Sequence, residues 1–136
     1  RVKRALYEIG LNEGFAERYP HELSGGQKHR IVIARALIGE PELVICDEPV
    51  SALDVSIQAE ILALLEKFKK EKGLTYIFIS HDLGVVKNIS DRVMVMYKGR
   101  IVEENETREI FENPKEDYTK ELIASIPGLA ERKKPY

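Results

Sequence analysis

Hydrophobic positions along the chain predict helices that alternate with strands. Residues 54–72 carry apolar side chains at helical spacing on one face, with Lys and Glu opposite, and Gly73 is placed to end this helix. The apolar stripe consists of Ile57, Ile61, Leu65 and Phe68. Two short apolar runs, 43–46 and 75–79, have strand length and many β-branched residues, which is typical of strands buried on both faces of a parallel sheet.

The rest of the pattern predicts helices near both ends and one hairpin. Further helices are expected before Leu11, at 15–18 (ended by Pro20), at about 27–38, directly after Asp82, at 108–112 and at 118–125. Residues 92–97 and 100–103, separated by Lys98-Gly99, predict an antiparallel hairpin. The alternation indicates an α/β fold with at least two parallel strands, of a length typical of one domain.

Composition and charge exclude several classes of function. The 136 residues include 21 Lys and Arg against 23 Asp and Glu, and the net charge of −2 gives no basic surface for nucleic acid. The single cysteine, Cys46, excludes an internal disulfide and a multi-cysteine metal site, which favours a reducing compartment. Within an apolar run, it is expected to be a small buried hydrophobe. No apolar run approaches the roughly 18 residues of a membrane span, and no signal peptide is expected.

The first candidate for chemistry is the acidic pair Asp47 and Glu48. Both follow the predicted strand 43–46, at the edge of an α/β sheet where ligands bind. One carboxylate there can hold a hydrated Mg²⁺, and its neighbour can orient or deprotonate a water molecule. An acidic strand end that only caps a neighbouring helix is the alternative of equal weight.

The second candidate is Ser24-Gly25-Gly26-Gln27. Ser24 followed three residues later by Gln27 is a capping box, an ordinary helix start. Two consecutive glycines exceed what a cap needs, because glycine lowers helix stability. Bare backbone at a helix N-terminus suits an incoming phosphate, so phosphate contact is favoured over capping alone, although both can hold together.

The remaining polar candidates are less specific. Ser51 and Asp54 have the spacing of another capping box. His81 follows a predicted strand, where a histidine is more often structural than catalytic. His21 and His29 have no carboxylate or cysteine at metal-ligand spacing, which argues against a zinc site.

The order of these segments resembles the signature, Walker B, D-loop and switch-histidine series of ATP-binding cassette (ABC) ATPases. In chain order they are Leu23-Ser24-Gly25-Gly26-Gln27, Leu43 to Glu48, Ser51-Ala52-Leu53-Asp54 and His81. A narrower resemblance links the chain to the ATPase subunits of oligopeptide and dipeptide importers. It is carried by Tyr19-Pro20-His21-Glu22, by the run from Cys46 to Ser56, by His81-Asp82-Leu83, and by Asn113-Pro114 with Tyr118-Thr119-Lys120.

The resemblance implies a partial P-loop NTPase fold and an ATP molecule bound between two ATPase domains. The signature of one domain then closes over the γ-phosphate held by the other. Ser24, Gly25 and Gly26 would supply hydroxyl and N–H donors to that phosphate, and Gln27 would support the loop.

The same resemblance implies the roles of four further residues. Asp47 would hold Mg²⁺ through water, and Glu48 would be the general base for the attacking water. His81 would contact the γ-phosphate, and Asp54 would couple the two sites across the dimer.

The chain is expected to be the C-terminal portion of one ABC ATPase domain. Residues 1–40 would be the end of the helical subdomain with the signature helix, 41–105 the core, and 106–136 a C-terminal tail. No Gly-x-x-x-x-Gly-Lys-Ser/Thr segment occurs, so the chain alone is not expected to bind ATP tightly or hydrolyse it. An uncovered apolar sheet face is also expected, and such a face promotes self-association.

The expected partners are a second ABC ATPase subunit, integral membrane permease subunits and, indirectly, an extracytoplasmic solute-binding protein, with no nucleic acid. The protein would act as a peripheral ATPase at the cytoplasmic face of the membrane, energising the uptake of oligopeptides, dipeptides or related solutes. Two alternatives remain open: one half of an ABC ATPase of DNA repair or chromosome maintenance, and a non-catalytic ABC domain. A long heptad region before the signature would distinguish the first, while Glu48 and His81 argue against the second.

Overall fold

The computed structural model describes residues 1–127 and divides the chain into two compact units, Arg1–Ile79 and Ser80–Tyr136. Together they give the predicted mixed α/β class with parallel strands. The division into segments 1–40, 41–105 and 106–136 stays a prediction.

The N-terminal unit contains three α-helices, two short 3₁₀ helices and one pair of parallel strands. They are α1 (Val2–Glu8), η1 (Glu13–Glu17), η2 (Pro20–Glu22), α2 (Gly25–Leu37), β1 (Leu43–Asp47), α3 (Val55–Lys72) and β2 (Thr75–Ile79). The register of the strand pair runs from Leu43 opposite Thr75 to Asp47 opposite Ile79. Gly73 ends α3 in the left-handed conformation, as predicted.

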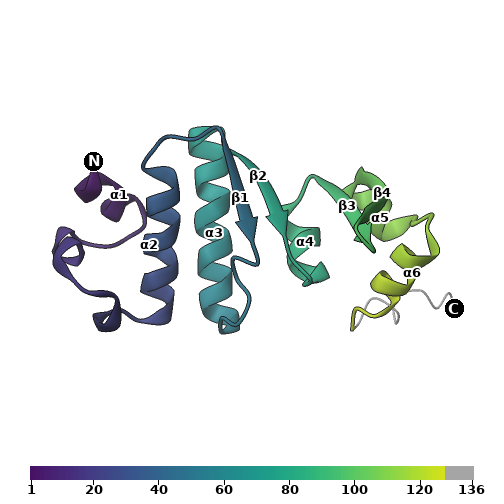
Figure 1. Ribbon diagram of the computed structural model, residues 1–136, viewed down its shortest axis with the longest axis horizontal. Coiled ribbons are helices and arrows are strands. Elements are labelled where there is room, and N and C mark those ends of the chain that lie inside the picture. The colour runs from purple at the N-terminus through teal and green to yellow at the C-terminus, as the bar shows by residue number, and fades with distance from the viewer. Residues whose placement is uncertain (128–136) are drawn as a thin grey trace, which may run out of the picture. The chain divides into compact units, whose positions relative to one another are not determined.

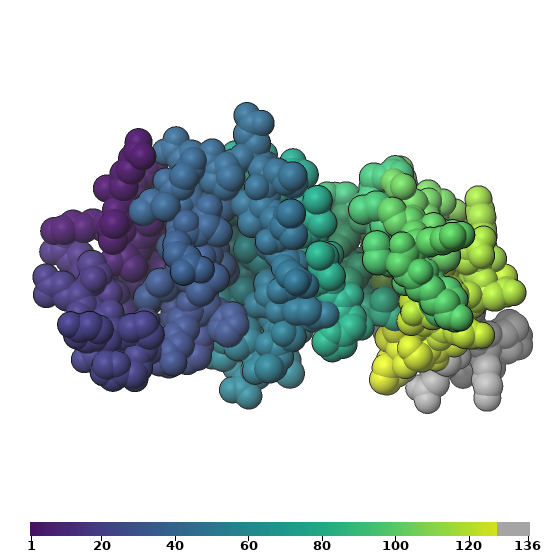
Figure 2. Space-filling model, in the orientation of Figure 1, coloured from purple at the N-terminus to yellow at the C-terminus, as the bar shows by residue number. Residues whose placement is uncertain are grey.

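Side chains from three helices form the core of this unit. Leu6 and Ile9 from the α1 segment pack with Leu37 of α2 and Phe68 of α3. Figure 2 shows the purple α1 segment against the blue α2 segment. Within the unit, α3 covers one face of the strand pair, and the Tyr76 hydroxyl donates a hydrogen bond of 3.1 Å to the Leu65 carbonyl.

The prediction that β1 and β2 are buried on both faces is wrong for the part of the chain that the structure describes. Leu43 and Ile45 of β1 are 50% and 64% exposed, and Ile77 and Ile79 of β2 are 40% and 48% exposed. These residues alternate with Cys46, which is buried as predicted, because successive side chains of a strand point to opposite faces. The strand pair therefore has one covered face and one apolar, uncovered face.

The segment before α2 also differs from the prediction. The helix predicted at 15–18 is the 3₁₀ helix η1, which begins at Glu13 because the Asn12 side chain accepts the Gly14 N–H. Pro20 ends no helix but occupies the first position of η2, where a missing N–H costs nothing. The helix predicted from about Gln27 begins two residues earlier, at Gly25.

The C-terminal unit is built on the predicted hairpin. Its elements are α4 (Leu83–Ile89), β3 (Arg92–Tyr97), β4 (Arg100–Glu106), α5 (Thr107–Glu112) and α6 (Asp117–Ala124). Lys98 and Gly99 form the two-residue turn, both with positive φ, which matches the twist of the paired strands. Val95, Ile110 and Phe111 form its core. No helix of residues 1–127 is long and apolar enough to cross a membrane.

Candidate functional site

The N-terminus of α2 carries the predicted capping box. The Ser24 Oγ accepts the Gln27 N–H at 3.3 Å, and the Gln27 Oε1 accepts the Ser24 N–H at 3.0 Å. Because the Oγ acts here as an acceptor, its own hydroxyl hydrogen remains available to a ligand. Capping is therefore confirmed, and it leaves a polar donor at the helix start.

The two glycines that follow expose backbone donors. The first N–H groups of a helix have no intrahelical partner, and in the described chain no acceptor meets those of Gly25 and Gly26. A Cβ at Gly25 would meet nothing within 4 Å, whereas one at Gly26 would lie 3.2 Å from the Ile57 side chain. Packing against α3 therefore explains Gly26, but no protein contact explains Gly25. Open space over free N–H groups at a helix N-terminus suits an anion.

The acidic pair stands at the carboxyl end of β1. Asp47 is the last strand residue and is exposed, and Glu48 is half-buried. The Glu48 N–H donates to the Ile79 carbonyl at 2.9 Å, which extends the strand pairing by one bond. Glu48 has a left-handed backbone with φ 48°, a conformation that costs a non-glycine residue roughly 1–2 kcal/mol. Such backbone strain is common at functional sites.

The turn after Glu48 corrects one prediction. Ser51 and Asp54 form no capping box: the Ser51 hydroxyl donates instead to the Glu48 carbonyl at 3.0 Å. Asp54 occupies the N-cap position of α3, but its side chain accepts no N–H from the first turn. Ala52 also has a positive φ of 58°, so the segment is a tight turn rather than a helix start. The Asp54 carboxylate is exposed.

These segments lie toward one end of the N-terminal unit. In Figure 1, α2 and α3 both begin at the end toward which β1 runs, so the signature segment, the acidic pair and Asp54 share it. The contact between Gly26 and Ile57 joins the first turns of the two helices. The fold thus places anion donors and carboxylates that are far apart in the sequence toward the same end of the unit.

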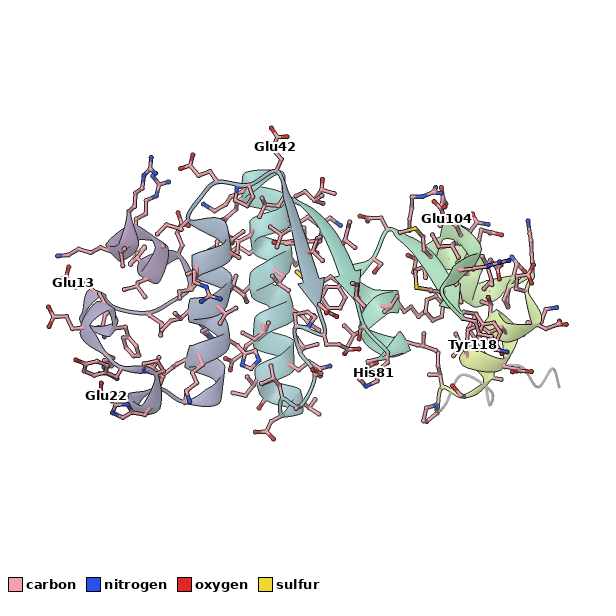
Figure 3. The ribbon with its side chains drawn as sticks, viewed as in Figure 1. Glu13, Glu22, Glu42, His81, Glu104 and Tyr118 are labelled. Carbon is pink, nitrogen blue, oxygen red and sulfur yellow. The ribbon has the colours of Figure 1, made fainter. Side chains whose placement is uncertain are left out.

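His81 belongs to the C-terminal unit. It is exposed, and Figure 3 shows its side chain projecting from the ribbon ahead of α4. Its neighbours have local structural roles: the Asp82 carboxylate caps α4 by accepting the Val85 N–H at 3.1 Å, and the Ser80 Oγ accepts the Asp82 N–H at 3.0 Å.

Asp47, at the carboxyl end of β1, is the candidate ligand for a magnesium ion. Among residues 1–127 no group of three or more His, Cys, Asp or Glu side chains could hold a metal ion. The exposed Asp47 carboxylate fits a hydrated Mg²⁺, which commonly keeps several waters and takes only one or two protein carboxylates.

Comparison with known proteins identifies the class. Residues 1–51 match the family model described as ABC transporter. The fold resembles a dimeric, post-hydrolysis structure of the ATP-binding cassette MJ0796 bound to ADP and Pi, with a TM-score of 0.65 and 35% identity over 77% of this chain and 45% of that one. It also resembles an inward-facing, putative metal-chelate type ABC transporter, with a TM-score of 0.73 and 35% identity over 79% of this chain and 42% of that one. The chain is therefore similar, in sequence and in fold, to the ATP-binding proteins of the ABC transporter family.

Within this family the chain is similar to the oligopeptide transport ATP-binding proteins. It is 56% identical to AmiF of Streptococcus pneumoniae over 98% of its own length and 44% of that protein. It is 58% identical to OppF of Bacillus subtilis, and 58% identical to OppF of Salmonella typhimurium, over 93% of its length in each case. It spans 42% and 38% of those two proteins.

Proposed function

We propose that this chain acts within the ATP-binding subunit of an ABC importer, where it closes over ATP and supplies the general base for hydrolysis. The observation that carries the proposal is the start of α2, where the Gly25 and Gly26 N–H groups have no partner in the described chain and open space lies over Gly25. These donors and the Ser24 hydroxyl would bind the γ-phosphate of ATP held by a second ATPase subunit. Gln27 would hold the loop through its bond to Ser24.

The two carboxylates at the end of β1 would bind Mg²⁺ and activate the attacking water. Glu48 would accept a proton from water as the water oxygen attacks the γ-phosphorus and ADP leaves. Asp47 would hold Mg²⁺ through water, and that ion, when bound, neutralises charge on the phosphates. His81 would contact the γ-phosphate, and the exposed Asp54 would couple the two sites across the subunit pair.

The substrate and partners follow from the similarity to oligopeptide transport ATP-binding proteins. We infer uptake of oligopeptides, dipeptides or related solutes through integral membrane permease subunits. A solute-binding protein would act outside the membrane, with the ATPase peripheral on its cytoplasmic face.

The variant Glu48→Gln in the full-length subunit tests this function, because the amide keeps the shape of the side chain but cannot accept the proton. Hydrolysis should fall at least about a hundredfold, as expected for the loss of a general base. ATP-driven association of the subunits, followed by sedimentation, should persist.

The matched control is Glu42→Gln, which changes an exposed glutamate just before β1 (Figure 3). It should leave both hydrolysis and association unchanged. If Glu48→Gln retained hydrolysis, the base would lie elsewhere. If the unmodified subunit hydrolysed no ATP with its partners present, the proposed function itself would be wrong.

A further inference from the structure

The side chain of Arg30 connects three helices of the N-terminal unit. Its Nη1 donates to the Ile9 carbonyl, at the C-terminal end of α1, at 2.9 Å. Its Nη2 donates to the Glu60 carboxylate of α3 at 2.6 Å. Arg30 itself lies on α2, and only 27% of its side chain is exposed. One guanidinium therefore fixes α2 against both of its neighbours.

The backbone of α1 accommodates this side chain closely. Gly10, which follows Ile9, has φ 76°, and a Cβ there would lie 3.1 Å from the Arg30 Nη1. A glycine thus supplies both the left-handed turn and the room for the guanidinium. This fit indicates a contact of defined geometry rather than a loose surface ion pair.

The ion pair adds to the core packing between α2 and α3, in which Leu37 and Phe68 take part. Gly26 touches Ile57, and one helical turn further along each helix Arg30 binds Glu60. Residues four apart on α2 and three apart on α3 lie on the same face of their helices. Together with the core packing, these two contacts set the position of the first two turns of α2 on α3.

We propose that Arg30 is a positioning residue for ATP hydrolysis, which sets where the signature donors of α2 stand relative to the start of α3. This inference rests on the proposed function. A planar guanidinium can bond to two acceptors in fixed directions, and an ammonium on a flexible stem cannot reproduce that geometry. Loss of the second bond would let the start of α2 shift, and a shift of about 1 Å at a reacting centre can cost a hundredfold in rate.

The test compares Arg30→Lys with Arg35→Lys in the full-length subunit assembled with its partners. Arg35 is exposed on the last turn of the same helix and makes no ion pair in the described chain. Arg30→Lys should lower kcat about tenfold or more. It should also raise the half-inhibitory concentration of orthovanadate, which mimics the γ-phosphate, by a similar factor. Arg35→Lys should change neither value.

A second variant tests the proposal even if the Arg30→Lys protein does not fold. Glu60→Gln retains Arg30 but removes the charged acceptor, and it should change kcat and orthovanadate inhibition in the same direction to a smaller extent. The exchange of both residues, Arg30→Glu with Glu60→Arg, should recover part of the loss, because it restores the ion pair but not the bond to Ile9.

A purely structural role for Arg30 would lower the unfolding temperature and the active fraction without changing orthovanadate inhibition. That result would overturn the inference while leaving the proposed function intact. Absence of hydrolysis in the unmodified subunit would instead contradict the proposed function.

Discussion

The two glycines at the start of α2 occupy adjacent positions for different physical reasons. A side chain at position 26 would crowd Ile57, so Gly26 lets α2 approach α3 closely. Position 25 is open, and glycine there lowers helix stability without any packing gain. No contact within residues 1–127 compensates for this stability loss, and the proposed contact with phosphate would account for it.

Substituting these glycines separates stability from function. Gly25→Ala should stabilise the protein by up to about 0.5–1 kcal/mol, since alanine is the better helix former and nothing crowds the new methyl group. The same methyl group would cover the N–H donors, so ATP hydrolysis should fall. Urea denaturation and steady-state hydrolysis of the full-length subunit measure the two effects.

Gly26→Ala is the comparison for this prediction. The new methyl group would crowd Ile57, so Gly26→Ala should not show the gain in stability that is expected of Gly25→Ala. A Gly25→Ala protein with unchanged hydrolysis would show that no phosphate approaches these donors.

Residue types at the site are well predicted from sequence, whereas backbone conformation is not. The capping box of Ser24 and Gln27 follows from a spacing rule and is confirmed. Ser51 and Asp54 satisfy the same rule, yet the chain turns tightly there and Ser51 bonds to Glu48 instead. Left-handed φ values at Glu48 and Ala52 have no sequence signal, because neither residue type favours them. Arg30 was also missed, since its partners are distant in sequence.

At the scale of elements, Glu103 of β4 ties the start of α6 to the hairpin. Its carboxylate accepts the Lys115 N–H at 2.9 Å and the Glu116 N–H at 3.1 Å. Desolvation raises the pKa of Glu103, but these two N–H donors and the Lys115 charge lower it more, so the net pKa lies below its ordinary value of 4.5. The ionised form is thus the one that the folded unit favours.

This shift predicts a pH dependence of stability. A carboxyl whose pKa is lower in the folded state stabilises the protein above its unfolded pKa, near 4.5, and that contribution is lost as the pH falls through the folded value. Glu103→Gln should destabilise the protein at pH 7. It should also reduce the dependence of the unfolding temperature on pH in this acidic range. Thermal unfolding between pH 3 and 7 measures both effects. Glu104→Gln, on the neighbouring exposed residue (Figure 3), is the control, and an unaltered acid profile in Glu103→Gln would contradict the assignment.

The limits of most helices and strands follow from hydrophobic periodicity and turn residues. The strand 75–79, the hairpin turn at Lys98-Gly99 and the helix end at Gly73 are confirmed. The 3₁₀ geometry of η1 is not predictable in the same way, because five residues are too few for periodicity to distinguish the helix types. Burial of β1 and β2 depends on what packs against the sheet, which the pattern of one strand does not contain.

At the scale of the whole molecule, the uncovered face of the β1–β2 pair is an apolar surface of the N-terminal unit. It consists of Leu43, Ile45, Ile77 and Ile79. Contiguous apolar surface of this kind favours association with other protein surfaces.

The 136-residue chain on its own should therefore self-associate. The double variant Ile45→Lys with Ile77→Glu should shift the population toward monomer in sedimentation velocity experiments, because burying the introduced charges is costly. Val32→Lys, at another apolar residue that is 52% exposed, should leave the association unchanged. A monomeric unmodified chain would show that this face does not drive association.

The two strand pairs can also form at different times while the chain is being synthesised. The β3–β4 hairpin closes across two residues, so it can form soon after its second strand leaves the ribosome. The parallel pairing of β1 with β2 has to await the whole of α3. A nascent chain stopped before Thr75 would therefore present the apolar 43–47 segment without its strand partner, which makes that segment a natural target for a chaperone that binds extended hydrophobic sequences.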